Sequence, residues 1–296
     1  MTEADGTRVT AQSLIAQRDA VIESRRRDQA TSALPGGFAI RKRGQGQVIA
    51  DSRPYIHGDD MRHVDRGATA RTGTLHVRTF HEERDRVSFL VADFRPSMLW
   101  GMQRAFRSVA AAEALAWLGW QAVEAGGRVG LMAITAEERV IVRTQGGTRG
   151  MLAVIGGLVR AHAGALDSAL AAARGGKPKF ADPTLGETLS VLHRIVPRGA
   201  SVLIATALDS LGEDFDAVMG RLTQHRSPRF VLIEEGALQS LPTGHYPLRG
   251  PDGARRSARC LRAADPDKGL ERIAAYDTLR VDVGLPVHAA LTWAGT

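Results

Sequence analysis

Residues 86–97, RVSFLVADFRPS, decide the fold of this 296-residue chain. Residues 87–92 form a nearly continuous apolar run, which is too short for a helix and suits a strand buried on both faces of a sheet. A carboxylate, Asp93, follows directly, and Arg95, Pro96 and Ser97 then lead into a long helical pattern. In open α/β sheets, ligands bind at the carboxyl edge of the parallel strands, so this stretch predicts polar groups at such an edge.

Strand and helix patterns alternate from residue 87 to the end of the sequence. Strands are predicted at residues 201–206, 229–233 and 287–292, and hairpins at residues 128–143 and 246–260. Helices are predicted at residues 105–125, 150–162, 166–174, 184–194, 214–224 and 266–283. This alternation favours the α/β class, with a doubly wound, mostly parallel sheet and helices on both faces.

Composition narrows the class of protein. One cysteine, Cys260, excludes an internal disulfide and fits a reducing compartment. The longest apolar segment, residues 109–126, contains two glutamates and is predicted to be a core helix rather than a membrane span. The first ten residues are polar and charged, unlike a signal peptide. A cytoplasmic protein is therefore expected.

Nucleotide and nucleic-acid binding are not supported. The glycines at 44 and 46 lack the third glycine of a phosphate-binding loop, and Pro178 stands after Lys177 where such a loop needs Ser or Thr. The net charge of +7 comes mainly from arginine, but aromatic residues make up only 5% of the chain. An arginine excess without interleaved aromatics does not indicate a nucleic-acid site.

Three regions are predicted: an N-terminal helix and tail (residues 1–30), a β-rich collar (31–86) and the main α/β domain (87–296). Acids and arginines alternate at short range in the collar, which suits bidentate ion pairs and a structural network. The alternative is that Asp59 and Asp60 form an acid–base or metal-binding pair. Adjacent residues of an extended chain point in opposite directions, which favours the structural interpretation.

The collar also carries a family resemblance. The segment RPYIHGDDMRHVD, residues 53–65, followed by Ala70 and Arg71, resembles the signature of the DUF58 family, which is bacterial and has no assigned biochemical function. That family usually has tryptophan where this chain has Arg66. The resemblance continues to roughly residue 292. The motif residues expected to form the structural network are Arg53, Tyr55, Gly58, Asp59, Asp60, Arg62, Asp65 and Arg71.

The resemblance implies a main domain similar to a von Willebrand factor A domain. Many such domains hold Mg²⁺ or Mn²⁺ at the carboxyl edge of the sheet through Asp-x-Ser-x-Ser in a first loop, a threonine in a second and an aspartate in a third. Carried onto this chain, the positions are Asp93, Arg95 and Ser97 in the first loop, Thr184 in the second, and Thr206 with nearby Asp209 in the third.

Two of these positions depart from a metal site. Arg95 puts a permanent cation where a neutral oxygen is needed, and a unit charge 4 Å from another costs about 4 kcal/mol at an effective dielectric of about 20. Thr206 removes the third-loop carboxylate. We therefore predict a degenerate site without metal, in which Arg95 pairs with Asp93 or Asp209 in place of the ion. Such a guanidinium could also receive a partner's carboxylate; the alternative is that Arg95 points into solvent.

The function expected from the resemblance is a non-enzymatic adaptor that works with a MoxR-type AAA ATPase and a client protein, in a chaperone- or assembly-related role. The sequence contains no Gly-x-Ser-x-Gly elbow, His-Glu-x-x-His pair or Cys-x-x-Cys motif. One alternative is a Mg²⁺- or Mn²⁺-dependent ligand binder that uses Asp93, Ser97 and Thr184. A second alternative is an enzyme built on histidines and carboxylates of the collar: His57, His63, His76 and His81 with Asp59 or Asp65.

Overall fold

The computed structural model describes residues 6–32, 49–56, 59, 61, 64–80, 86–174, 183–239, 242–249, 255–260 and 267–293. The chain divides into two compact units. The larger unit contains Met1–Arg26 and Arg86–Thr296, and the smaller one is Arg27–Asp85.

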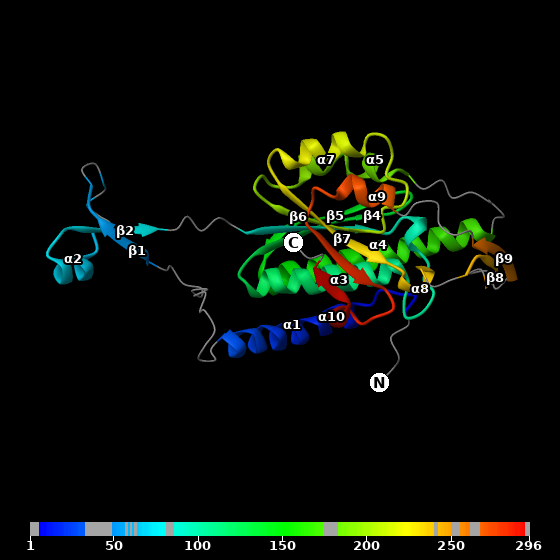
Figure 1. Ribbon diagram of the computed structural model, residues 1–296, viewed down its shortest axis with the longest axis horizontal. Helices are drawn as coiled ribbons and strands as arrows, with labels where there is room; N and C mark the ends of the chain where they lie inside the picture. The colour runs from blue at the N-terminus through cyan, green and yellow to red at the C-terminus, as the bar shows by residue number, and fades with distance from the viewer. Residues whose placement is uncertain are drawn as a thin grey trace. The chain divides into compact units, whose positions relative to one another are not determined.

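Among the described residues, seven strands of the larger unit form one sheet in the order β11-β10-β7-β6-β3-β4-β5 (Figure 1). Every neighbouring pair from β10 to β4 is parallel, while β5 and β11 are antiparallel to their neighbours. The strands are β3 (Val87–Asp93), β4 (Arg128–Ile134), β5 (Arg139–Gly146), β6 (Ser201–Thr206), β7 (Ser227–Glu234), β10 (Thr278–Asp282) and β11 (Leu291–Trp293).

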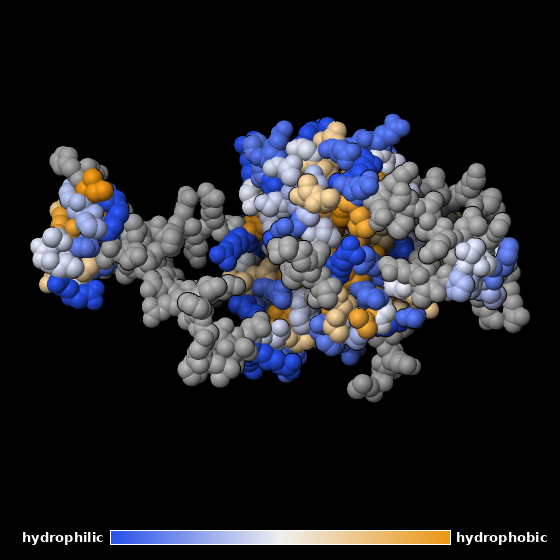
Figure 2. Space-filling view, viewed as in Figure 1, coloured by the Kyte–Doolittle hydropathy of each residue, from blue (hydrophilic) through white to orange (hydrophobic). Residues whose placement is uncertain are grey.

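Helices cover both faces of this sheet, with α1, α3 and α4 on one side and α5, α7 and α9 on the other (Figure 1). Hydrophilic residues lie over α5 and α7 on the face shown in Figure 2. Within the described residues, no helix is long and apolar enough to cross a bilayer. The helices are α1 (Ala11–Ser32), α3 (Arg107–Glu124), α4 (Gly147–Arg174), α5 (Leu185–Leu189), α6 (Leu192–Ile195), α7 (Phe215–Thr223), α8 (Gly236–Gln239), α9 (Asp267–Ile273) and α10 (Val287–Ala290), with the 3₁₀ turn η2 at Pro96–Met98.

Strand β3 contributes to a hydrophobic core on each face of the sheet. Leu90 and Ala92 pack in the core with α3 and α4, while Phe89 and Val91 pack in the core with α5 and α7. Burial of each large apolar side chain stabilises the fold by roughly 1.5–3 kcal/mol. Because both faces of the strand are buried, consecutive positions favour apolar residues, and the strand sequence is a continuous apolar run. The chain is therefore a mixed α/β protein with a mostly parallel sheet flanked by helices, as its sequence predicts.

Several predicted element boundaries are wrong. The helix expected over residues 266–283 ends at Ile273, and Thr278–Asp282 is the strand β10. Leu279 and Val281 are buried while Arg280 is exposed, so the two-residue period of a strand, not the helical period, describes this segment. The strand expected at residues 287–292 is instead the helix α10 followed by the short strand β11.

Two further helix predictions differ from the structure. The two helical pieces expected between residues 150 and 174 form the single helix α4, which begins at Gly147. Gly164 lowers the helix propensity by about 1 kcal/mol, but Ala161 and Ala165 beside it are buried in the core, which offsets that cost. The helix expected at residues 184–194 is divided into α5 and α6. The hairpin at residues 246–260 is formed by β8 (Gly244–Arg249) and β9 (Arg255–Cys260).

The smaller unit contains an antiparallel pair, β1 (Ile49–Pro54) and β2 (His76–Phe80), with the helix α2 (Arg66–Thr72) between them. The helix was not expected from the sequence. Its N-cap is Asp65, whose carboxylate accepts hydrogen bonds from the main chain of Gly67 (2.9 Å) and Ala68 (3.0 Å). A short polar side chain that accepts these bonds satisfies donors that no residue inside the helix can reach.

A buried histidine joins three segments of the larger unit. His162 of α4 is only 1% exposed, and its ring lies edge-on to Phe94. Nδ1 accepts from the Val9 main chain (3.5 Å), so the neutral ring carries its proton on Nε2 and donates it to the Ser108 hydroxyl (3.0 Å). Burial, with a smaller contribution from Arg8, lowers the pKa of His162 to about 4.

This histidine predicts acid sensitivity of the fold. In the unfolded state, with a pKa near 6.5, this histidine binds a proton at a pH where the folded protein does not. The unfolding free energy should therefore fall by about 3 kcal/mol as the pH decreases from about 6.5 to about 4. His162→Gln keeps an N–H for Ser108 but cannot titrate. We expect its unfolding free energy, measured with denaturant at several pH values, to fall less than that of the wild type.

The exposed His193 provides the matched control, because His193→Gln should retain the wild-type pH dependence. An unchanged pH dependence in His162→Gln would contradict this account of the buried histidine.

Candidate functional site

The strand order of the sheet reverses at β3, which has β4 on one side and β6 on the other. In open α/β sheets, the crevice at such a switch point is where ligands bind. Asp93 ends β3 and Thr206 ends β6, so both lie at the carboxyl edge of these two neighbouring strands. Both side chains are buried. The switch point is therefore the candidate functional site.

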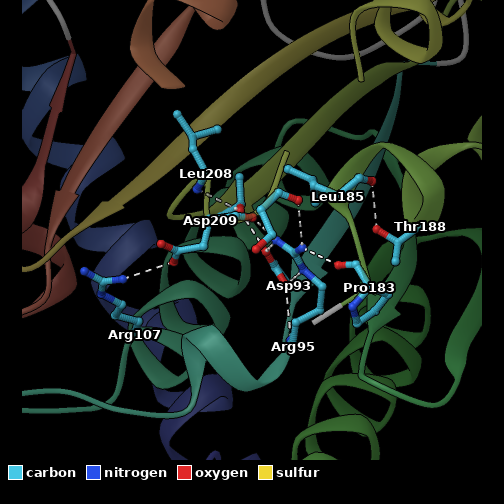
Figure 3. A network of polar contacts seen from close by, with 10 residues as sticks. Asp93, Arg95, Arg107, Pro183, Leu185, Thr188, Leu208 and Asp209 are labelled. Atoms are coloured by element: carbon cyan, nitrogen blue, oxygen red, sulfur yellow. Dashed lines mark hydrogen bonds and ion pairs between the residues drawn. The ribbon is translucent and has the colours of Figure 1, made fainter. Parts of the chain in front are cut away.

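The Asp93 carboxylate is fully used by groups of the same chain (Figure 3). Its Oδ1 accepts from the main-chain N–H of Arg95 (3.1 Å) and from the guanidinium Nε (2.9 Å). Its Oδ2 accepts from Nη2 of Arg95 (2.8 Å) and from the Thr206 hydroxyl (2.8 Å). An ionised carboxylate offers about four acceptor positions, so these four bonds fill them.

The N–H donors of the Arg95 guanidinium also all have acceptors in the chain. Besides its two bonds to Asp93, Nη2 donates to the Asp209 carbonyl (2.8 Å), and Nη1 donates to the carbonyls of Pro183 (2.7 Å) and Ser210 (3.4 Å). The residue is 0% exposed. A guanidinium has five N–H donors, and each has an acceptor here. We refer to Asp93 and Arg95 as the switch-point ion pair.

The loop after β6 is shaped around this cation. Leu208 (φ 63°) and Ser210 (φ 49°) adopt the left-handed region that non-glycine residues rarely occupy. Each such residue costs of the order of 1–3 kcal/mol. The conformation turns the carbonyls of Asp209 and Ser210 toward the guanidinium, and a hydrogen bond to a charged group contributes about 1.5–3 kcal/mol. The bonds to Arg95 therefore offset the strain of the loop.

The structure decides between the alternatives for Arg95. Its side chain pairs with the carboxylate of Asp93 and donates to the main-chain carbonyl of Asp209. The alternative of a solvent-exposed Arg95 is wrong, because the side chain is 0% exposed. The idea that this guanidinium receives a partner's carboxylate does not fit either, since its donors already have acceptors within the chain.

The other predicted site residues have different partners. The Thr184 hydroxyl is the N-cap of α5 and accepts from the main chain of Glu187 (3.2 Å). The Asp209 carboxylate, about 40% exposed, pairs with Nη1 of Arg107 at 3.2 Å. Ser97 lies partly buried in the η2 turn. The structure thus brings Asp93, Arg95 and Thr206 into side-chain contact, while Thr184 and Asp209 serve neighbouring elements.

Sequence reasoning missed the groups that extend this edge toward β7. Arg107 stacks on Trp100 at 4.2 Å; burial lowers its pKa, and Asp209 and Glu235 act in the opposite direction. Glu235 is 4% exposed, and its Oε2 accepts from the Met102 main chain (3.3 Å). Burial raises the pKa of Glu235. A signal was present, because Glu235 is the first residue after β7 and so, like Asp93 at the end of β3, is an acid at the carboxyl end of a strand.

The residues at the switch point do not fit a divalent cation. Mg²⁺ requires six oxygen ligands at about 2.0–2.1 Å, whereas the oxygens of Asp93 already accept four hydrogen bonds and a guanidinium lies against them. The Thr184 oxygen is occupied as a helix cap. Across the described part of the chain, no group of three or more His, Cys, Asp or Glu could hold a metal ion.

The collar motif is partly described. Arg53 and Asp59 form a bidentate ion pair, both bonds being 2.7 Å, which raises the pKa of Arg53 and lowers that of Asp59. Tyr55 donates its main-chain N–H to Leu75 (2.8 Å). Asp65 caps α2, and Arg71 lies exposed in the last turn of that helix.

The remaining predicted residues of the collar are mostly not described. Gly58, Asp60 and Arg62 lie outside the described residues, as do His57, His63 and His81. His76 bonds the nearby Thr74 carbonyl at 2.8 Å.

These features define a class: a mixed α/β protein whose mostly parallel sheet, flanked by helices, is closed at its switch point by an internal ion pair. The chain belongs to DUF58, a family described as proteins of unknown function. The family profile matches residues 51–258, which include the collar motif and most of the larger unit's sheet.

Curated relatives share one segment with this chain. The uncharacterized proteins Rv1480 of Mycobacterium tuberculosis and Mb1516 of Mycobacterium bovis are each 37% identical over 78 residues. That alignment covers 25% of this chain and 25% of each relative, so the chain matches about a quarter of their length. Among solved structures, the conserved hypothetical protein BatB from Bacteroides thetaiotaomicron aligns with a TM-score of 0.39 and 12% identity, over 67% of this chain and 90% of that protein.

The switch-point ion pair predicts strongly non-additive stability effects. Arg95→Met leaves a carboxylate buried without its cation, which should lower the unfolding free energy by about 3–5 kcal/mol. Adding Asp93→Asn removes the stranded charge, so the double variant should lose less than the sum of the single losses, with a coupling of about 1–3 kcal/mol. Denaturant unfolding of the four proteins measures this difference.

Arg229→Met is the control, because the Arg229–Asp277 pair is exposed on both sides and its loss should cost no more than about 1 kcal/mol. If Arg95→Met does not fold, a folded double variant still demonstrates the coupling. Strict additivity would contradict the assignment.

Proposed function

We propose that this chain is a non-enzymatic interaction module, a von Willebrand factor A-like adaptor that works with a MoxR-type AAA ATPase and presents or remodels a client protein. The observation that carries the proposal is the guanidinium of Arg95, whose hydrogen bonds occupy the acceptor positions of Asp93. The choice of partner rests on the resemblance of the chain to proteins that work with these ATPases.

Arg95 takes over the structural role that an ion has in the metal-binding domains of this kind. Its donors reach three separate segments: the end of β3 at Asp93, the start of α5 at Pro183, and the loop after β6 at Asp209 and Ser210. A metal would join the same loops through oxygen ligands. In this proposal the edge is assembled permanently, and recognition of a partner there does not depend on metal.

A serine–histidine pair in the core favours the same interpretation over a hydrolase. The Ser108 hydroxyl lies 3.0 Å from Nε2 of His162, a distance that a nucleophile and its base would need. Ser108 is 0% exposed and His162 is 1% exposed. Nδ1 of the histidine accepts from the Val9 main chain, so Nε2 carries the proton and cannot take one from serine. The pair therefore serves packing.

Metal titration tests the proposal that Arg95 takes the place of a metal ion. Because a ligand that binds only the folded state must raise its stability, we expect no change in the melting temperature of the wild type between EDTA and about 5 mM Mg²⁺ or Mn²⁺. The double variant Arg95→Ser/Thr206→Asp restores the oxygen ligands of the adhesion-site pattern and should gain a metal-dependent rise in melting temperature.

Arg221→Ser, which changes an exposed arginine on α7, is the matched control and should remain insensitive to metal. A wild-type melting temperature that rises with either metal would contradict the proposal.

Association with the ATPase tests the adaptor role separately. Affinity-tagged full-length chain should retain a MoxR-type AAA ATPase of the same organism when Mg²⁺ and ATP or a slowly hydrolysed analogue are present. Asp209→Arg reverses a charge that is about 40% exposed at the switch-point edge, so this variant should retain less of the ATPase. Absence of the ATPase in every nucleotide state would contradict the adaptor role without affecting the metal result.

A further inference from the structure

The strand β5 forms one edge of the large sheet. It follows β4 in a tight antiparallel hairpin, and among the described strands β4 alone pairs with it. This strand, Arg139–Gly146, has eight residues, which is longer than the commonest strand length of about five to six residues. Such an edge presents main-chain N–H and C=O groups that can pair with a further strand.

The register of the hairpin shows which main-chain groups face outward. The turn closes with a main-chain hydrogen bond of 3.0 Å from Thr135 to Glu138, and bonded pairs then alternate with non-bonded pairs as far as Leu131–Val142, beyond which the register shifts. The main chains of Val140 and Val142 consequently bond β4. The outward-facing groups belong to Arg139 and Ile141.

The exposed side chains of β5 form a pattern of their own. Val140 and Val142 pack against the core under α4, while Arg139, Ile141 and Arg143 are exposed. Ile141 is 47% exposed, which is high for a large aliphatic residue. The edge therefore offers one aliphatic side chain with a cation two residues away on each side.

The two arginines lack acidic partners within the described residues. Arg139 is held by hydrogen bonds to the carbonyls of Thr188 (3.2 Å) and Glu187 (3.5 Å), which fixes its guanidinium beside the strand without neutralising its charge. On the opposite half of the sheet, by contrast, Arg229 and Arg280 pair with carboxylates. The β5 edge thus presents two guanidinium groups with which the carboxylates of a partner can pair.

This charge distinguishes between two possible occupants. If the β5 edges of two copies paired antiparallel about Ile141, each Arg139 would lie opposite an Arg143 of the other copy, and like charges directly opposite are destabilising. The arginines therefore oppose self-association, a use of edge charge that is common in sheet proteins. An acidic strand would instead place carboxylates opposite both arginines.

We propose that the β5 edge is a docking site for an extended acidic segment of a partner protein, which adds to the sheet as a further strand. The spacing of Arg139, Ile141 and Arg143 specifies the pattern acid–x–aliphatic–x–acid on the face of the segment that meets them. Main-chain bonds to β5 supply affinity, and the alternating side chains supply selectivity. The site is distinct from the switch-point ion pair and does not depend on the proposed partner ATPase.

A labelled peptide tests the proposal. The probe is a capped, fluorescein-labelled peptide containing Glu-Thr-Val-Thr-Glu, titrated with the full-length chain by fluorescence anisotropy; its counterpart has Lys in place of both Glu residues. We expect the acidic peptide to bind in a salt-sensitive manner, the lysine peptide not to bind, and Arg143→Glu to weaken binding by about tenfold, since an attractive opposed pair becomes a repulsive one.

Two further measurements separate strand addition from simple charge attraction. Arg221→Glu alters an exposed arginine of α7 and should leave binding unchanged. Hydrogen exchange of the Ile141 amide should slow when the acidic peptide is bound, because that N–H then gains an acceptor. The proposal is overturned if the acidic peptide fails to bind, if Arg143→Glu binds it as tightly as the wild type, or if Ile141 exchange is unaffected.

Discussion

A carboxylate buried at the end of the first parallel strand requires a cation, and Arg95 supplies it. An isolated ion in a protein interior costs several kcal/mol, and here the guanidinium and the Thr206 hydroxyl stabilise the Asp93 carboxylate through hydrogen bonds. The remaining donors of the guanidinium need acceptors for the same reason. The start of α5 and the left-handed residues of the loop after β6 provide those acceptors as main-chain carbonyls.

This constraint organises the carboxyl edge of the sheet. If the loop after β6 changed conformation, the guanidinium of Arg95 would lose some of its carbonyl acceptors. The same loop places the Asp209 carboxylate beside Arg107, which stacks on Trp100. Removing the cation would therefore loosen several connections at once. An edge tied together in this way offers a rigid surface to a partner, whereas an edge held by an exchangeable ion would change with the metal supply. This difference is the physical basis of the proposed adaptor role.

The sequence predicts the central strands β3, β6 and β7 well because they contain apolar runs that stand out from their surroundings. The predicted strands at residues 87–92 and 201–206 agree with β3 and β6, since two-sided burial leaves little freedom in residue type. Residues 278–282 were misread because Arg280 interrupts the apolar pattern and the segment follows a helix without a strong break. Only its contacts with β7 make it a strand.

The site could be predicted only in part. Asp93 and Arg95 follow a strand end that is visible in the sequence, and Thr206 is identified through the resemblance to the adhesion-site loops. The acceptors at Pro183 and Ser210 are main-chain carbonyls, which any residue could supply, so no sequence pattern reveals them. Arg107 and Glu235 are joined to the site by folding across more than 100 residues, as the 3.2 Å Arg107–Asp209 pair illustrates.

The most direct test is anomalous diffraction from crystals of the full-length chain grown with Mn²⁺. We expect density for a guanidinium that bridges both oxygens of Asp93, and no anomalous peak at the switch point. A manganese peak coordinated by Asp93 and Ser97, with the Arg95 side chain displaced toward solvent, would contradict it.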